Sequence, residues 1–213
     1  MSTKLFRSLT LALALVLILS LTAFSTLAAA LPPGDEAEIT AEVNGWSAPA
    51  PRSLPVPDQA AHARALQLLG STGILLAPDS TNKRVMAFDP LNGDLVDADF
   101  IPADTAHLST PKHAMLSADG QSILVADQLT DGVYQYDFDG NYIGLFAPAG
   151  GVNTAILDNI RGMALRPNGN LLVTVGSSGN ANAIAEFDTA GNYLGNFIAA
   201  GSGGLSSPFA ILH

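Results

Sequence analysis

Three basic residues occupy one repeated position in this chain of 213 residues. Arg64, Lys112 and Arg161 align when three similar segments are superimposed, and Phe209 takes that position in a fourth. Guanidinium and ammonium groups are the usual partners of carboxylates and phosphates. If the fold brings the repeated positions together around an axis, we expect these three side chains to form an anion site. The alternative is that each one caps the start of a strand and pairs with a nearby carboxylate.

Histidines are the next residues that could do chemistry, because several of them on neighbouring strands can hold zinc. Only His113 lies on a predicted strand that repeats, and Gly162 and Ala210 take its place in the later segments. No ligand is therefore repeated there, and a histidine with a structural or exposed role is the simpler interpretation. We predict no cofactor, with calcium or zinc as the alternative. The four histidines are His62, His107, His113 and His213.

Two acidic stretches have the alternating oxygen ligands of a calcium loop. The first runs from Asp137 through Asp139 and Gly140 to Asn141, and the second covers residues 94–99. Neither continues to a bidentate glutamate at the distance that such a loop requires. A hairpin turn accounts for the first stretch, so Asp137 and Asp139, like His113, are weak metal candidates.

Composition excludes several classes of function. The chain has no cysteine, which rules out thiol catalysis and cysteine metal sites. It has no Gly-x-Ser-x-Gly elbow, no phosphate-binding Walker loop and no His-Glu-x-x-His motif. The formal net charge is −10, and it becomes −12 once residues 1–30 are removed. This charge repels phosphate backbones and anionic membranes, so we predict no nucleic-acid partner.

The first 57 residues predict export. Lys4 and Arg7 precede an apolar run over residues 9–21, and three alanines end at Ala30, as in a secretory signal peptide. We predict cleavage after residues 1–30, a secreted, cell-surface or periplasmic location, and no stable membrane insertion of the mature chain. An uncleaved N-terminal anchor is the alternative. Residues 31–57 hold six prolines and are expected to form an extended linker.

The rest of the chain, residues 58–213, is organised around a repeated unit of strands. Its clearest copy spans residues 122–146, with an apolar run, an alternating aromatic run and a third strand. Asp139-Gly140 between the last two strands predicts a hairpin with a type I′ turn. The turn glycines Gly93, Gly140 and Gly191 are 47 and 51 residues apart.

A period near fifty residues with four strands per unit is typical of the blades of a β-propeller. We therefore predict an all-β fold, with blades at about 63–110, 111–158 and 159–206 and the first strand of a fourth at 207–213. Blades must stack to make a core. The apolar strands at 74–77, 123–126 and 171–175 are expected to be covered on both faces.

The segment before the first apolar strand has two interpretations. Gln59 to Leu69 has the apolar spacing of an amphipathic helix, with Ala61, Ala65 and Leu68 on one side. Its position relative to the later repeats favours a strand over Ala65 to Leu69. We predict the strand.

The repeated pattern resembles the NHL and SMP-30-like β-propellers. An opening strand such as Arg161-Gly162-Met163-Ala164 is followed by a turn, then by Ile-Leu-Val-Ala-Asp and by an aromatic-Asp pair, over about residues 63–213. Val175 stands where the second unit has Asp127, so any role of that position is uneven around the ring. The resemblance implies the fold but no particular activity.

Two functions remain open. The first is an exported, non-catalytic propeller that binds an unknown protein or small-molecule ligand, or that mediates surface interaction. The alternative is a metal-dependent hydrolase, lactonase or lyase that acts on a small extracellular substrate. Three units do not close a ring, because propellers use roughly four to eight blades. We expect the sequence to be a fragment of a longer protein, with a ring built from several chains as the alternative.

Overall fold

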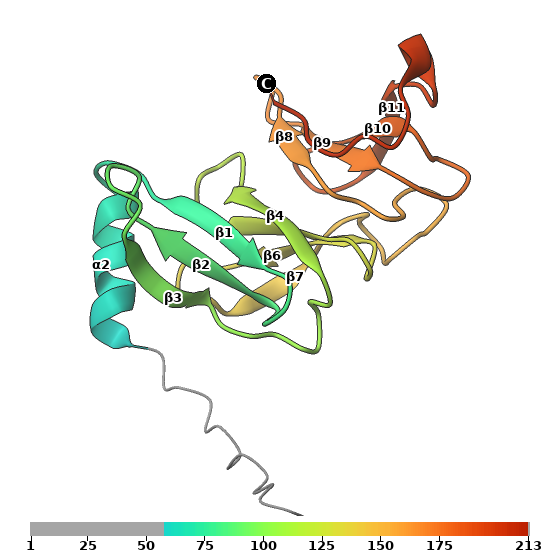
Figure 1. The fold of residues 1–213 in the computed structure, drawn as a ribbon. Helices are drawn as coiled ribbons and strands as arrows, with labels where there is room; N and C mark the ends of the chain where they lie inside the picture. Colours follow the sequence, from blue (N-terminus) through green and yellow to red (C-terminus); the bar gives the residue numbers. More distant parts are fainter. Residues whose placement is uncertain (1–57, 213) are drawn as a thin grey trace, which may run out of the picture. The chain divides into compact units, whose positions relative to one another are not determined.

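The computed structural model describes residues 58–212, which form an all-β fold with one α-helix longer than a single turn. The predicted signal peptide, the predicted linker and His213 lie outside the described residues. Figure 1 shows antiparallel sheets that follow one another along the chain. Within residues 58–212, no helix combines the length and the apolar character that a membrane crossing requires.

Two of the sheets are complete four-stranded blades. In each, every strand pairs with the next one along the chain in antiparallel fashion, in the orders β4-β5-β6-β7 and β8-β9-β10-β11. The predicted all-β propeller fold is confirmed, with four-stranded blades in these two sheets. The strands of the second blade are Pro111–Leu116, Ile123–Asp127, Gly132–Tyr136 and Tyr142–Ala147, and those of the third are Met163–Leu165, Leu171–Val175, Ala183–Phe187 and Tyr193–Ile198.

The core lies between neighbouring blades. All five residues of β5 and all five of β9 are buried, as expected for strands that are covered on both faces. Successive side chains of a strand point to opposite faces of its sheet. Ile123 accordingly belongs to the core shared with the first blade, whereas Leu124 packs in the core that also contains Val173 of the third.

The first blade differs from the prediction, because a helix precedes it where a strand was expected. Its sheet has three strands, β1 (Leu75–Asp79), β2 (Arg84–Phe88) and β3 (Leu95–Ile101). The predicted strand at Ala65 to Leu69 is wrong, since α2 spans Gln59–Leu69.

Capping and composition explain the helix. The Asp58 carboxylate accepts hydrogen bonds from the backbone N–H groups of Ala60 at 3.0 Å and Ala61 at 3.3 Å. An aspartate at this position satisfies donors that a helix otherwise leaves free, and alanine and leucine are strong helix formers. Ala65, fully buried, anchors the helix in the core of the first two blades. The repeat register was therefore a poorer guide than the local helix signals.

Because helix α2 stands where a strand was expected, β1 lies at an edge of its sheet. Leu75 is 53% exposed, and no residue of β1 is fully buried. The expectation that residues 74–77 are covered on both faces is therefore wrong, because the strand that would flank β1 is replaced by the helix.

The hairpin turn after β6 also differs from the prediction. Gly140 has a φ of +79°, but Asp139 is not among the residues with positive φ, so the turn is not type I′. The N–H of Gly140 donates to the carbonyl of Asp137, which gives a type I turn followed by a left-handed glycine. Asp188 to Asn192 repeat this turn in the third blade, with Gly191 at +79°.

The turn glycines also pack against the preceding blade. A Cβ on Gly191 would lie 1.7 Å from the carbonyl oxygen of Phe146 in β7, and a Cβ on Gly140 would lie 2.9 Å from that of Phe100 in β3. Only a residue without a side chain fits such a contact. The regular spacing of these glycines thus reflects blade stacking as well as turn geometry.

Residues 207–212 form no strand, contrary to the prediction of a first strand for a fourth blade. Ser207 has a φ of +47°, outside the extended region, and Pro208 has no N–H to donate to a ladder. The Ser207 N–H donates instead to the side chain of Asn182. The segment still runs close to β8, because a Cβ on Gly162 would lie 2.7 Å from the carbonyl oxygen of Phe209.

Candidate functional site

His113 on β4 is held in a contact between two blades. Its Nδ1 atom accepts a hydrogen bond of 2.8 Å from the backbone N–H of Met163 at the start of β8. Burial lowers the pKa of His113, so the neutral imidazole that can accept this bond is favoured. His113, which the sequence suggests as a weak metal candidate, therefore uses one ring nitrogen in a hydrogen bond between two blades.

Arg161, immediately before β8, contacts the C-terminal segment. Its Nη1 donates to Ser207 Oγ at 2.9 Å, and its guanidinium carbon lies 5.2 Å from the centroid of the Phe209 ring. Its Nε is buried and has no hydrogen-bond partner in the described structure. Arg161 thus holds residues 207–209 against the third blade.

The other two basic candidates have separate surroundings. Arg64 belongs to α2, where its side chain is 57% exposed and lies 4.0 Å from the Asp89 carboxylate. Lys112 lies in an irregular part of the β4–β5 ladder, between the pairs of Pro111 and His113. Arg64 and Arg161 each have a partner of their own, Asp89 and Ser207. The anion site stays a prediction.

Asp127 ends β5 and organises the crossover between the first and second blades. Its side chain is fully buried, and one carboxylate oxygen accepts backbone hydrogen bonds from Ser109 and Thr110 at 2.8 and 2.6 Å. The other oxygen accepts from the N–H groups of Leu129 and Thr130 at 3.1 and 3.0 Å. Four backbone donors satisfy this carboxylate, so its role is to fix two loops.

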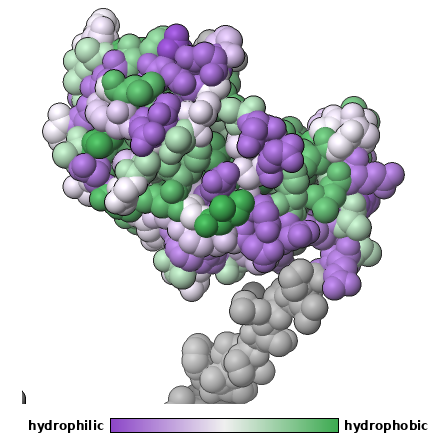
Figure 2. All heavy atoms as spheres, turned by 180° about the vertical axis from the view of Figure 1, so that it is seen from behind, coloured by the Kyte–Doolittle hydropathy of each residue, from purple (hydrophilic) through white to green (hydrophobic). Residues whose placement is uncertain are grey.

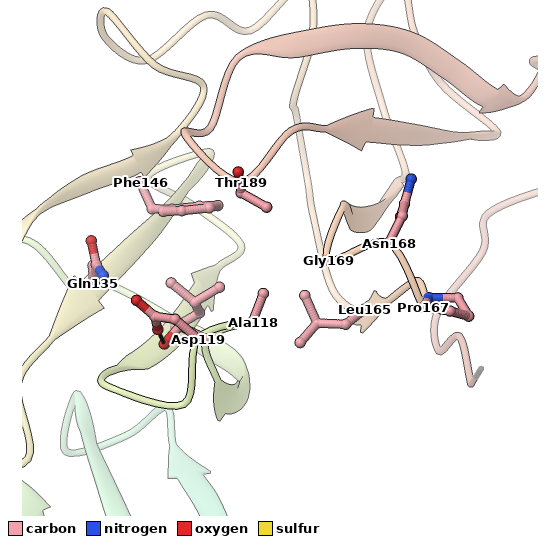
Figure 3. A pocket seen from close by; sticks show the side chains of 11 residues that line it. Ala118, Asp119, Gln135, Phe146, Leu165, Pro167, Asn168, Gly169 and Thr189 are labelled. Carbon is pink, nitrogen blue, oxygen red and sulfur yellow. Dashed lines mark hydrogen bonds between the residues drawn. The ribbon is translucent and has the colours of Figure 1, made fainter.

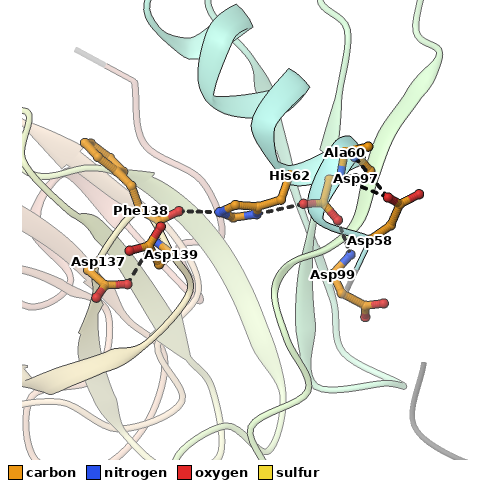
Figure 4. Close-up of polar contacts among 9 residues, drawn as sticks. Asp58, Ala60, His62, Asp97, Asp99, Asp137, Phe138 and Asp139 are labelled. Carbon is orange, nitrogen blue, oxygen red and sulfur yellow. Dashed lines mark hydrogen bonds and ion pairs between the residues drawn. The ribbon is translucent and has the colours of Figure 1, made fainter. Parts of the chain in front are cut away.

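His62 docks the helix on the sheets, as Figure 4 shows. Its Nδ1 lies 2.9 Å from an Asp97 carboxylate oxygen, and its Nε2 lies 2.8 Å from the Phe138 carbonyl oxygen. The ring thus connects α2 to β3 and to the turn after β6. The imidazole also stacks on Phe100, with ring centroids 5.3 Å apart.

The calcium-like stretch is a turn held by its own side chains. Asp137 Oδ1 accepts from the N–H groups of Asp139 and Asn141 at 3.0 and 2.8 Å, and its Oδ2 accepts from the Asn141 amide at 3.0 Å. Asp188 has the same contacts in the next blade. Across residues 58–212, no three histidine, aspartate or glutamate side chains are grouped so that they could hold one metal ion.

The sequence did not single out His107 as part of a polar cluster. Its Nδ1 lies 2.7 Å from Asp104 Oδ2, an oxygen that also accepts a hydrogen bond of 2.9 Å from the Tyr136 hydroxyl. The His107 ring stacks on Tyr142 with centroids 3.6 Å apart. Burial, together with the Asp104 carboxylate, raises the pKa of Tyr136. The Asp-x-x-His spacing of Asp104 and His107 could have indicated this cluster from the sequence. Its contacts hold the crossover against the second blade.

A pocket of about 420 Å³ lies between the second and third blades (Figure 3). In Figure 3, the Phe146 ring extends toward Thr189, while Ala118 and Leu165 face each other across the gap. The walls come from the turns β4–β5, β8–β9 and β10–β11 and from the strands beside them. Its lining residues are Ser117, Ala118, Asp119, Leu124, Gln135, Phe146, Leu165, Pro167, Asn168, Gly169 and Thr189.

Apolar side chains are scattered over the outer surface of residues 58–212. On the face in Figure 2, hydrophilic and hydrophobic residues are interspersed. The exposed apolar residues include Leu194 and Phe197 on β11, and the Arg166 guanidinium carbon lies 4.5 Å from the centroid of the Phe197 ring. Such scattered exposure is ordinary for a protein surface.

Comparison with known proteins supports the fold. No family model and no curated protein matches the chain. A protein of unknown function from Bacteroides thetaiotaomicron VPI-5482 is similar in structure, with a TM-score of 0.50 and 15% identity over 67% of this chain and 40% of that one. A candidate 6-phosphogluconolactonase from Bacteroides fragilis NCTC 9343 has a TM-score of 0.43 and 21% identity, covering 66% of this chain and 38% of that one.

Virginiamycin B lyase from Staphylococcus aureus has a TM-score of 0.43 and 14% identity, over 65% of this chain and 41% of the lyase. The chain thus spans about two fifths of the length of each of these three proteins. At these identities the likeness concerns the fold alone. The order of the strands and the two complete blades make the chain a β-propeller protein.

Proposed function

We propose that this chain is an exported β-propeller repeat protein, of the NHL or SMP-30-like type, that binds a protein or small-molecule ligand without converting it. Export rests on the basic, apolar and small-residue pattern of residues 1–30. The NHL or SMP-30-like assignment rests on the repeated motifs, such as the strand that ends in Asp127.

One observation carries the non-catalytic part of the proposal: three side chains capable of acid–base or metal chemistry are engaged in the frame. His113 joins two inner strands, His62 joins the helix to two blades, and Asp127 holds two loops. A catalytic group must reach its substrate or metal through a free polar atom. The hydrogen bonds of His113, His62 and Asp127 are made to other parts of the protein, so they stabilise the fold instead.

The second candidate is a metal-dependent hydrolase, lactonase or lyase. It is favoured by His113 on an inner strand and by the resemblance of the fold to a candidate lactonase and a lyase. This function requires about three protein ligands around one ion. Residues 58–212 bring no such group together, so further ligands would have to come from elsewhere.

A turnover assay separates the two candidates. The mature chain is incubated with 6-phosphogluconolactone and, separately, with virginiamycin B, in calcium, in zinc and in chelator. We expect both compounds to disappear at the rate of the protein-free blank. Metal-dependent consumption that falls in His113→Asn but persists in Gln121→Ala, an exposed turn substitution, would establish the enzyme and refute the proposal.

Export has its own test. The full chain is expressed in a bacterial host, cell fractions are separated, and the N-terminus of the product is sequenced. We expect the product outside the cytoplasm, with Leu31 as its first residue. Cytoplasmic protein that retains Met1 would contradict the proposed export.

A further inference from the structure

The gap between the second and third blades, the second gap, differs in chemistry from the gap between helix α2 and the second blade, the first gap. The repeat aligns Leu165 with Leu116 and Gly169 with Gly120. Leu165 and Gly169 line the second gap, and Leu116 and Gly120 line the first. The third aligned position follows the aspartate of the hairpin turn. It is Phe138 in the first gap and Thr189 in the second.

The first gap is lined only by apolar residues. It encloses about 370 Å³, and α2 contributes Leu66 and Leu69 to its walls. Packing of the helix therefore gives this gap a hydrocarbon surface. The complete lining is Leu66, Leu69, Gly70, Leu116, Gly120 and Phe138.

The second gap presents polar atoms that are oriented but unused. Gln135 Nε2 donates to Ser122 Oγ at 2.7 Å, which leaves its Oε1 available. Asp119 Oδ1 accepts from Ser117 Oγ at 2.6 Å, and Asn168 Oδ1 accepts from a backbone N–H at 3.1 Å. One atom of each side chain is thus anchored. Asp119 Oδ2, Asn168 Nδ2 and the Thr189 hydroxyl make no hydrogen bond to any residue between 58 and 212.

Charge and shape restrict what this gap can bind. No lysine, arginine or histidine lines it, and the hydrogen bond from Ser117 lowers the pKa of Asp119, which keeps that carboxylate ionised. An anionic ligand would be repelled here. The apolar part of the wall includes the Phe146 ring and Leu165, and a cavity of this volume falls within the range of small-molecule sites, roughly 300 to 1,000 Å³.

We propose that the pocket between the second and third blades binds a neutral, hydroxyl-rich small molecule of the size of a mono- or disaccharide. The ligand hydroxyls donate to Gln135 Oε1 and Asp119 Oδ2 and accept from Asn168 Nδ2, and a carbon face of the ligand packs on Phe146. The inference rests on the proposed function, because it names the ligand class of a propeller that binds without converting.

The test uses the mature chain and a defined panel: glucose, galactose, maltose and cellobiose as neutral probes, with glucosamine and glucose 6-phosphate as charged ones. Saturation-transfer NMR detects contact, and isothermal titration gives the Kd. The key variant is Thr189→Phe, which installs the residue that the chain itself has at position 138. Gln121→Ala, on the β4–β5 turn but outside the pocket, is the matched control.

We expect at least one neutral sugar to bind with a millimolar or lower Kd, and glucose 6-phosphate to bind more weakly. Thr189→Phe should weaken binding at least about tenfold, the effect of losing about 1.4 kcal/mol, while Gln121→Ala leaves it unchanged. Should Thr189→Phe fail to fold, Asn168→Ala on an exposed turn must show the same loss.

Three results would overturn the inference: no neutral sugar binds, binding is unchanged in Thr189→Phe, or glucosamine binds best and loses affinity in Asp119→Asn. Failure of the proposed function looks different, because the sugar would then be consumed during the titration. Intact sugars that do not bind would refute the ligand class and leave the non-catalytic propeller in place.

Discussion

The imidazole of His113 on β4 accepts a hydrogen bond from the backbone N–H of Met163 on β8, so one side chain joins the inner strands of two blades. Only the neutral ring can accept this bond, and burial already lowers the pKa of His113. The blade contact is therefore sensitive to acid.

We predict that acidification weakens the wild-type chain more than His113→Asn. Because the folded-state pKa is lowered, the unfolded chain binds the proton first, and stability is lost as the pH falls below about 6.5, the ordinary pKa of histidine. Asparagine keeps an acceptor but does not titrate. Urea unfolding of both proteins at pH 7.5 and pH 5 gives the comparison.

At pH 7.5 the variant should be less stable by about 1 to 2 kcal/mol, the loss of a good hydrogen bond and some packing. At pH 5 this difference should be smaller. A difference that stays constant or grows on acidification would show that His113 is not neutral in the fold.

Gly191→Ala should be far more damaging than Gly93→Ala. The two glycines have nearly the same φ, +79° and +78°, but a Cβ at position 191 meets the Phe146 carbonyl, whereas position 93 has open space. We expect a loss of about 1 to 2 kcal/mol for Gly93→Ala, from the left-handed backbone alone. Overpacking adds to this at position 191, for a total of about 3 to 5 kcal/mol. Equal losses in urea unfolding would contradict the stacked blades.

His62→Ala should release helix α2 from the blades. The substitution removes contacts to Asp97 and to the Phe138 carbonyl, and it leaves the Asp97 carboxylate, only 4% exposed, without its imidazole partner. The expected loss is about 2 to 4 kcal/mol. Arg64→Ala on the same helix should change stability by less than about 0.5 kcal/mol, because that side chain is exposed. Hydrogen exchange of residues 59–69 should quicken in the first variant only.

Asp127→Ala should prevent stable folding or lower the free energy of unfolding by about 3 kcal/mol or more, since four buried backbone donors lose their acceptor. Asp139→Ala is the control, because the turn is held by Asp137 instead. Thermal unfolding of the two variants and the wild-type chain measures the difference in stability. A mild effect at position 127 would mean that water replaces the carboxylate.

Much of the fold was readable from local sequence. The apolar runs that begin at Ile123 and Leu171, and the glycines about fifty residues apart, predicted the blades that the structure shows. These signals are local because each strand and turn is specified by its own side chains. The repeat register predicts a strand at 65–69, whereas the Asp58 cap stabilises the helix that the structure shows there.

The pocket was not predictable in the same way. Asp119 and Asn168 were visible as turn residues, and Thr189 had no distinctive signal at all. What makes them a candidate site is that their turns meet across a blade boundary, which depends on tertiary stacking. Likewise, His113 was visible as a histidine on a strand, but its acceptor role depends on the position of Met163 in the next blade.

Metal-dependent thermal unfolding tests the central claim, a propeller that binds without metal-assisted catalysis, most directly. A site for calcium or zinc at 100 times its Kd would stabilise the fold by about 2.7 kcal/mol, which raises the Tm of a domain of this size by roughly 5 to 10 °C. We predict the same Tm, within about 1 °C, in chelator and in millimolar calcium or zinc. A rise of several degrees that disappears in His113→Asn or Asp137→Asn would contradict the proposal and point to a metalloenzyme.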